Sequence, residues 1–195
     1  MFFDFVKNFF TSSKKESTEK TSLSLPVIET VFFSEEDLAK ILKEHSIWLK
    51  SNGSFGKRAS FNGMTIPSIN LFMADLKKAD FQGSDLTKSQ LQWADLSGAD
   101  FTGANLQDVD FFQSNLKKVS FRNANLVRAN LMSVEASETD FRDANLSMAD
   151  LRSARCDNAI FFRTDLKDAK LDSGEFNGVD FSSALNFNNK LSREI

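Results

Sequence analysis

Large apolar residues recur every five positions from Leu76 to Phe181, and this period constrains the fold more than any other feature of the chain. Of the 22 positions in this register, 20 are Leu or Phe, and the exceptions are Ala136 and Cys156. The residue two places earlier is always small, and Asp or Asn stands between the two in 15 of the 22 units. An internal repeat this regular outweighs the local propensities of its residues.

A five-residue period excludes an α-helix over this region. In a helix, five residues advance by about 500°, so successive apolar side chains would lie about 140° apart and form no face. In an extended segment, residues two apart point to the same side and the residue between them points to the other. The last two residues of each unit would then turn the chain. The pattern therefore predicts a chain that coils around an axis, with large and small side chains inside.

A longer period within the short one predicts the size of each coil. Every twentieth residue of a first column is Phe: Phe61, Phe81, Phe101, Phe121, Phe141, Phe161 and Phe181. The other three columns begin at Ile66, Leu71 and Leu76 and consist mainly of Leu. Four pentapeptides per coil predict a four-sided β-helix over 61–185, with about six coils spanning about 29 Å at the usual strand spacing.

The repeated units closely resemble those of the bacterial pentapeptide repeat proteins. Examples of the A-(D/N)-L-X-X unit are Ala94-Asp95-Leu96 and Ala124-Asn125-Leu126. The resemblance implies an all-β fold, a right-handed quadrilateral parallel β-helix. The resemblance is a weak guide to function, because most members of the family are uncharacterised. The period of five, instead of six, excludes the left-handed β-helix acyltransferases.

Residues 1–60 lack the period and divide into three segments. In residues 1–10 we expect a short amphipathic helix, a candidate membrane anchor whose apolar side chains are Phe2, Phe3, Phe5, Val6, Phe9 and Phe10. Residues 11–22 are polar and read as a flexible tether. Residues 23–60 are expected to cap the first coil, with a helix over 35–50 that begins at a capping box of Ser34 and Asp37.

The residue inventory indicates that the chain is not an enzyme. It has one histidine, His45, and one cysteine, Cys156, which are too few for a Cys/His metal cluster or a disulfide framework. His45 is expected to pack on the apolar face of the helix, and Cys156 to point inward. Four outward carboxylates form a column on one face: Asp75, Asp95, Glu135 and Glu175. A catalytic pair of carboxylates needs a pocket, and a flat solvated face offers none. We therefore expect no metal and no cofactor.

Apolar residues at turn positions of the third column form a candidate protein-binding surface, because a contiguous exposed apolar patch marks an interface. We name these residues the turn strip: Phe72, Met73, Trp93, Phe112 and Met132. Alternatively, residues 23–50 of the same chain cover them.

At the C-terminal end of the repeats, Asn186 breaks the second column, and residues 186–195 are expected to form a C-terminal cap. A candidate end contact, which would serve the cap or a homodimer, comprises Leu185, Phe187 and Ile195.

These features favour a non-catalytic scaffold that binds an unidentified protein. The resemblance suggests one alternative, a DNA mimic that modulates DNA gyrase. Residues 61–185 hold 18 acidic and 13 basic residues, a net charge of 13 − 18 = −5, whereas duplex DNA of about 29 Å carries about 17 negative charges. The second alternative is a membrane-attached or secreted effector that uses residues 1–10.

The sequence also carries expectations about location and nucleic acids. The chain has no run of about 18 apolar residues, and residues 1–10 lack the basic start and apolar core of a secretory signal. We therefore expect a bacterial cytoplasmic protein. Residues 1–10 are the candidate segment for a peripheral contact of that protein with a membrane. The net charge of −3 argues against direct binding of nucleic acid.

Overall fold

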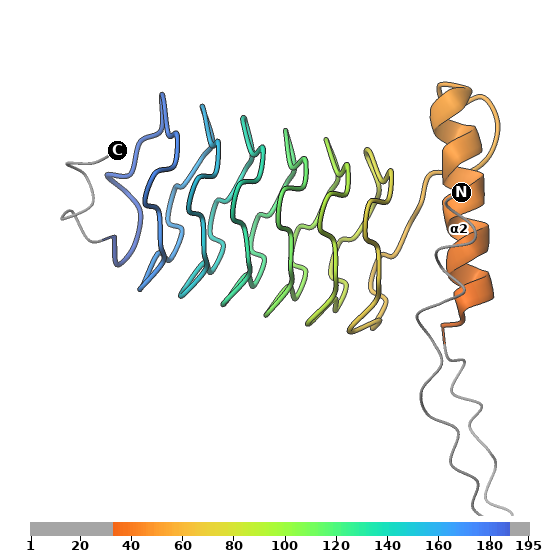
Figure 1. Cartoon of the computed structure of the whole chain (residues 1–195), viewed down its shortest axis with the longest axis horizontal. Coiled ribbons are helices and arrows are strands. Elements are labelled where there is room, and N and C mark those ends of the chain that lie inside the picture. The colour runs from red at the N-terminus through yellow and green to blue at the C-terminus, as the bar shows by residue number, and fades with distance from the viewer. Residues whose placement is uncertain (1–32, 188–195) are drawn as a thin grey trace, which may run out of the picture. The chain divides into compact units, whose positions relative to one another are not determined.

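The computed structural model describes residues 33–187, which form one α-helix followed by a coil of short β-bridges (Figure 1). The helix, α2, spans Glu35–Lys50, the range in which the sequence predicts a helix. From Ser60 to Leu185 the described backbone forms isolated parallel bridges, not longer strands. Each bridge joins residues twenty positions apart, beginning with Ser60 and Asp80. One coil therefore consists of four pentapeptides, the step expected from the Phe column.

Local interactions define both ends of α2. The Ser34 hydroxyl accepts a hydrogen bond from the backbone N–H of Asp37 at 3.1 Å, and the Ser34 N–H donates to the Asp37 carboxylate at 3.0 Å. This capping box satisfies two donors of the first turn. At the other end, the N–H of Gly53 donates to the Trp48 carbonyl at 2.8 Å, and Gly53 has a φ of 86°. Glycine adopts this left-handed conformation without steric cost.

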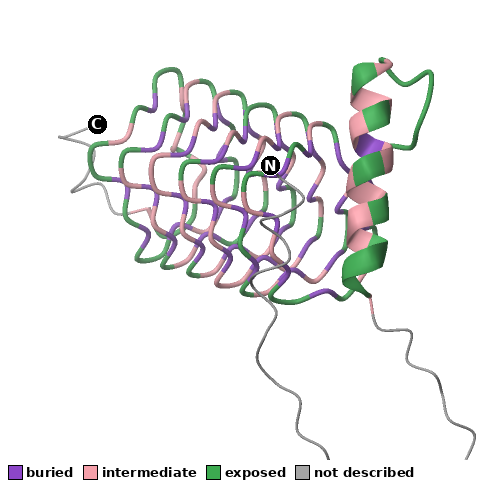
Figure 2. Cartoon of the chain, turned by 45° about the vertical axis from the view of Figure 1, so that its right-hand side comes forward, coloured by how far each residue is buried: buried purple, intermediate pink, exposed green. Residues whose placement is uncertain are grey.

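The apolar side of α2 packs against the first coil. Leu38, Ile41 and Leu42 are partly buried against the core. Just before the helix, the Phe33 ring meets the Phe61 ring edge-on, with centroids 6.2 Å apart. In Figure 2 the helix stands beside the first coil. These contacts remove apolar surface of the first coil from water.

Stacked phenylalanines form one side of the core. Neighbouring rings from Phe61 to Phe161 have centroids between 4.5 and 5.3 Å apart. Figure 2 shows that buried positions alternate with more exposed ones along the coils. In the fourth column, a Cβ at Gly174 would overlap the Phe176 ring, so the glycine makes room for the larger neighbour. The core is thus filled by matched large and small residues.

In most pentapeptides the chain turns through a hydrogen-bonded β-turn. The N–H of Ala74, for example, donates to the Leu71 carbonyl at 3.1 Å, and Met73 before it has a φ of 56°. A positive φ at the third turn residue is the mark of a type II turn and favours glycine. Glycine occupies this position in some units, such as Gly63, Gly83 and Gly103. In most units a residue with a side chain adopts the conformation instead.

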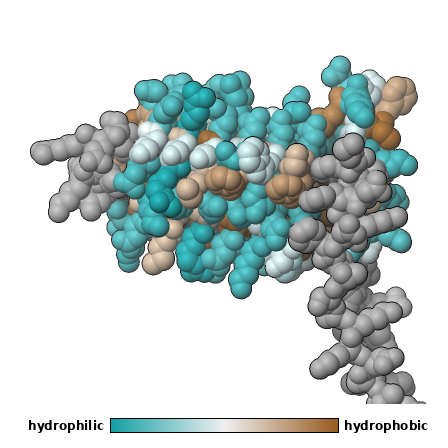
Figure 3. Space-filling view, in the orientation of Figure 1, coloured by the Kyte–Doolittle hydropathy of each residue, from teal (hydrophilic) through white to brown (hydrophobic). Residues whose placement is uncertain are grey.

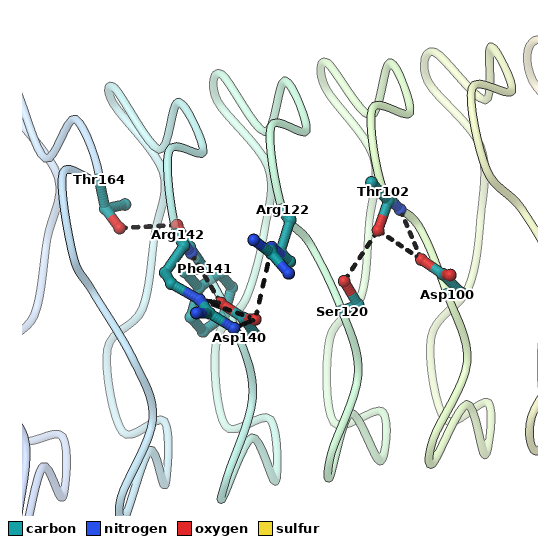
Figure 4. Close-up of polar contacts among 8 residues, drawn as sticks. All are labelled: Asp100, Thr102, Ser120, Arg122, Asp140, Phe141, Arg142 and Thr164. Atoms are coloured by element: carbon teal, nitrogen blue, oxygen red, sulfur yellow. Dashed lines mark hydrogen bonds and ion pairs between the residues drawn. The ribbon is translucent and has the colours of Figure 1, made fainter.

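The recurring Asp or Asn caps the turn that follows it. Asp100 Oδ1 accepts hydrogen bonds from the Thr102 N–H at 2.9 Å and from the Thr102 hydroxyl at 2.6 Å (Figure 4). The same bond to the backbone N–H two residues later is made by Asn70, Asp80, Asp85, Asp95, Asp110, Asn115, Asn125, Asn130, Asp140, Asn145, Asp150, Asp165 and Asp180. Asp and Asn side chains commonly stabilise turns in this way. The sequence pattern places these residues outside but does not reveal this role.

Candidate protein-binding surface

The turn strip follows four successive inward residues of the third column, but its members differ in exposure. Met73 is 56% exposed and Trp93 is 52% exposed. The other three members, Phe72, Phe112 and Met132, are only half-buried. The exposed apolar surface is therefore smaller than the five-residue patch that the sequence suggests. The β-bridges align the turns of successive coils, so side chains at neighbouring turns shield one another from solvent.

Trp93 is the centre of this surface. Its ring meets the Phe112 ring edge-on, with centroids 6.2 Å apart. Its φ of 61° belongs to the turn position that favours glycine. A bulky indole at such a position, half exposed, contributes little to the filled interior of the coil. On the side of the repeats turned to the viewer in Figure 3, a few apolar groups lie within a mostly hydrophilic surface.

Polar contacts bound the strip. Beside Trp93, Gln92 Nε2 donates to the Asp110 carboxylate at 2.7 Å, and Asp110 also accepts from the Phe112 N–H at 3.0 Å. Beyond Met132, Arg152 lies 3.5 Å from the Met132 sulfur while its guanidinium pairs with Asp150. An apolar centre with a polar rim is the usual anatomy of a protein interface.

The described part of residues 23–50 does not cover the two exposed members of the strip. Met73 and Trp93 keep more than half of their surface in the presence of α2. This segment instead contacts the start of the repeats: His45 of α2 accepts a hydrogen bond from the Ala59 N–H, and Phe33, just before the helix, packs on Phe61. Residues 23–32 lie outside the described residues, so cover by that segment stays a prediction.

A second group of exposed apolar residues escaped the sequence analysis. Ile160 is 42% exposed and Phe162 is 49% exposed, on either side of the buried Phe161. Met148, at a turn position of another column, is 53% exposed. A signal was available, because Ile160 interrupts the outward column in which Asp140 and Asp180 stand.

The residues of the candidate end contact have different environments. Leu185 is 50% exposed. Phe187 is half-buried and stacks on Phe181, with centroids 4.5 Å apart, so it extends the Phe column by one ring. Leu166, Leu171 and Asn186 line a hollow beside Phe187. Ile195 and the candidate anchor residues Phe2, Phe3, Phe5, Val6, Phe9 and Phe10 lie outside the described residues.

Ion pairs neutralise much of the outward carboxylate column. Lys77 Nζ lies 3.2 Å from Asp75 and 3.3 Å from Asp95. Arg155 lies 3.8 Å from Glu135 and 3.1 Å from Glu175. A catalytic pair needs two carboxyl groups whose different surroundings give them different pKa values. Carboxylates that share one solvated surface and are paired with cations lack that difference.

Two further observations concern chemistry and membranes. Cys156 is fully buried, and burial raises the pKa of its thiol, which keeps it protonated and unreactive. Across residues 33–187, no group of His, Cys, Asp and Glu is arranged to hold a metal ion. None of the helical segments within that range has the length and hydrophobicity that crossing a bilayer requires.

Comparison with known proteins gives a family and a set of structures. A family model for pentapeptide repeats matches residues 70–103 and 104–147, with 8 copies. No curated protein matches the chain. Among solved structures, it is similar to HetL, a pentapeptide repeat protein involved in heterocyst differentiation regulation in the cyanobacterium Nostoc sp. strain PCC 7120. The identity is 25% and the TM-score 0.35 over 64% of this chain and 62% of HetL, so the match spans less than two thirds of HetL.

Two other structures show the same kind of similarity. QnrB1, a plasmid-mediated fluoroquinolone resistance protein, is 18% identical, with a TM-score of 0.43 over 62% of this chain and 73% of QnrB1. Rfr23, a pentapeptide repeat protein from the cyanobacterium Cyanothece 51142, is 22% identical, with a TM-score of 0.29 over 65% of this chain and 87% of Rfr23.

Proposed function

Since this chain belongs to the pentapeptide repeat family, and its coil is accordingly a right-handed β-helix, we propose that it is a non-catalytic scaffold that binds another protein. The binding surface is the turn strip, with Trp93 as its anchor. The observation that carries this proposal is the half-exposed indole, which packs on Phe112 yet keeps 52% of its surface accessible. Tryptophan is enriched among residues that dominate binding energy.

The surface fits a protein partner better than a small substrate. Met73 and Trp93 are exposed at turns of neighbouring coils, and the rim around them is made of hydrogen-bonded polar side chains such as Asp110. An apolar centre with a polar rim can bury apolar area in an interface while the rim stays hydrated. Small-molecule sites are instead concave and mostly apolar.

Paired charges argue against a DNA mimic directed at gyrase. Arg128 makes two bonds to Asp108, at 2.6 and 2.7 Å, and Arg142 makes an equally short pair with Asp140. Arg163 lies 3.0 Å from Asp143. A surface that imitates the DNA backbone needs dense unpaired negative charge, whereas these carboxylates are matched with cations of the same chain.

The experiment has a gyrase arm and a binding arm. Purified full-length protein is added to a DNA gyrase supercoiling assay, where the scaffold predicts unchanged supercoiling and a DNA mimic predicts inhibition or protection. In parallel, immobilised wild-type protein and the double variant Met73→Ala/Trp93→Ala are used to capture partners from extract of the source cells. The matched control Met148→Ala removes an equally exposed methionine from another column.

Each outcome of that experiment has a defined meaning. We expect a partner retained by the wild type and by Met148→Ala, and lost from the double variant. Retention by all three proteins would place binding elsewhere on the surface. Gyrase inhibition by the wild type at stoichiometric amounts would favour the DNA mimic over the scaffold.

The remaining parts of the chain are assigned roles within the same proposal. We propose four flat faces for the coil, one per pentapeptide of each turn, with 61–185 as the repeat domain. The segment 23–60, including α2, caps the first coil, and 186–195 caps the last or joins two copies. We place the protein in the bacterial cytoplasm, with 1–22 as a tethered helix that reaches a membrane surface.

A further inference from the structure

His45, the single histidine of the chain, lies at the junction between α2 and the first coil. Its side chain is 0% exposed. Nδ1 accepts a hydrogen bond from the backbone N–H of Ala59 at 3.0 Å. The neutral ring therefore carries its proton on Nε2, which lies near the Lys77 backbone but makes no hydrogen bond of full geometry to the described residues. A single acceptor bond thus ties the ring to the chain that enters the coil.

The surroundings of the ring are closely packed. Trp48 stacks on His45 with centroids 5.7 Å apart and ring planes 13° apart. The chain after the helix is held near it, because the Lys57 N–H donates to the Glu44 carbonyl at 3.2 Å. A Cβ at Gly56 would overlap the Glu44 carbonyl and approach the Trp48 nitrogen. The ring therefore has little room to move while α2 is docked.

Charged groups of the first coil and of the connecting chain act on His45. Burial lowers the pKa of His45 and outweighs the other influences. Asp75 and the backbone of Lys77, both in the first coil, oppose this effect, whereas Arg58 in the connecting chain adds to it. The Lys77 ammonium itself is paired with Asp75 and Asp95.

We propose that His45 is a pH-sensitive switch whose protonation releases α2 from the first coil. Adding a proton from water to Nδ1 turns the acceptor into a donor, so that the ring N–H and the Ala59 N–H face each other. The same proton places a positive charge in a buried site. Undocking relieves both costs, because water can then solvate the imidazolium and the Ala59 N–H. Release exposes Phe61 and the apolar side of α2.

The direction of the pH response follows from the lowered pKa. A histidine that is harder to protonate in the docked state binds more protons when released. The contribution of His45 to docking is therefore complete above about pH 6.5, the ordinary pKa of histidine, and declines as the pH falls below it. Neutral conditions keep α2 docked.

Trp48 provides a local reporter for the test. The background variant Trp93→Phe leaves Trp48 as the single tryptophan of the full-length chain. Its fluorescence, the binding of an apolar dye and the circular dichroism of the coil are followed from pH 8 to 4.5. We expect a fluorescence change and increased dye binding with a midpoint below about 6.5, while the coil signal stays constant. The variant His45→Gln keeps an acceptor oxygen for Ala59 and should lose the transition.

Charge variants test the switch without altering the ring. Asp75→Asn should move the midpoint of release to higher pH, and Arg58→Gln should move it to lower pH, because Asp75 stabilises and Arg58 destabilises the protonated ring while α2 is docked. Lys118→Gln, at a distant coil, should leave it unchanged. A transition that survives in His45→Gln, or an absence of any transition down to pH 4.5, overturns the proposal. If His45→Gln does not fold, opposite shifts in the two charge variants still support it, and identical midpoints reject it.

Discussion

Trp93 and Phe112 pack edge-on across two neighbouring coils, with ring centroids 6.2 Å apart and ring planes at 83°. The backbone holds them in this position, because the Trp93 N–H donates to the Phe112 carbonyl at 3.0 Å. The rigid ladder therefore presents the indole at a defined place on the surface. An aromatic side chain fixed in this way loses little conformational entropy when a partner binds.

Trp93→Ala should affect binding more than folding. We expect a loss of about 0.5 to 1.5 kcal/mol in the free energy of unfolding, the usual contribution of an aromatic pair. The affinity for the captured partner should fall by about 2 kcal/mol or more. Urea denaturation and titration calorimetry measure the two effects. Met148→Ala, whose side chain is 53% exposed with a φ of 61°, should change neither; a matching loss of affinity there would make the Trp93 result nonspecific.

Phe121→Ala should be strongly destabilising. The ring is fully buried and stacks between Phe101 and Phe141, at 5.3 Å from each. Loss of the ring leaves a cavity that the rigid coils cannot close, at a cost of about 3 to 5 kcal/mol. Lys167→Ala, at an exposed turn, should cost less than about 0.5 kcal/mol. Equal urea midpoints for the two variants would contradict the inward assignment of the Phe column.

Asp100→Ala tests the turn cap. The carboxylate accepts from the Thr102 N–H, from the Thr102 hydroxyl and from Gln82 Nε2 at 2.6 Å. Removing it should cost roughly 1 to 2 kcal/mol of unfolding free energy. Asp100→Asn keeps the Oδ1 acceptor and should lose less than half of that amount. Thermal unfolding at neutral pH distinguishes them, and an Asn variant as unstable as the Ala variant would exclude the capping role.

The pair of Asp140 and Arg142 should make stability depend on pH. The guanidinium donates two bonds to the carboxylate, at 2.8 and 2.6 Å (Figure 4). Burial opposes ionisation of Asp140, but the bonds from Arg142 prevail and lower its pKa. A carboxyl with a lowered pKa stabilises the fold above about pH 3.9, and this contribution is lost as the pH falls through the lower folded-state value.

Arg142→Gln should therefore unfold at a lower temperature than the wild type at pH 7, and the difference should shrink as the pH decreases below about 4. Arg163→Gln is the matched control, because its pair with Asp143 is more exposed and should contribute less at every pH. A constant difference between wild type and Arg142→Gln from pH 7 to 2 would show that the arginine acts through packing and not through charge.

The period and the helix were predictable from the sequence because both depend on neighbours along the chain. Alternation of side chains in an extended segment decides that Leu96 and Ala94 face inward and Asp95 faces outward. The capping box needs only Ser34 and Asp37, three residues apart. The role of Asp100 was less visible, because its bond to Thr102 depends on the turn conformation.

The environment of surface residues depended on contacts between coils. Phe112 is shielded because Trp93 of the neighbouring coil lies against it, a relationship between residues about twenty positions apart that no local pattern encodes. Arg128 could have paired with several carboxylates of its surroundings, and the folded geometry selects Asp108 of the preceding coil. The exposure of a surface side chain and its ion pairs with other coils depend on how the coils stack. The five-residue period alone therefore does not predict them.

The sequence by itself determined that twenty residues make a coil, that Phe stacks on Phe, and that a helix precedes the repeats, since these follow from side-chain alternation and local hydrogen bonding. Only the tertiary structure decided that His45 accepts the Ala59 N–H and that half of the Trp93 indole remains exposed. Both depend on how separately formed elements approach each other, which the free energy of packing settles after each element has formed.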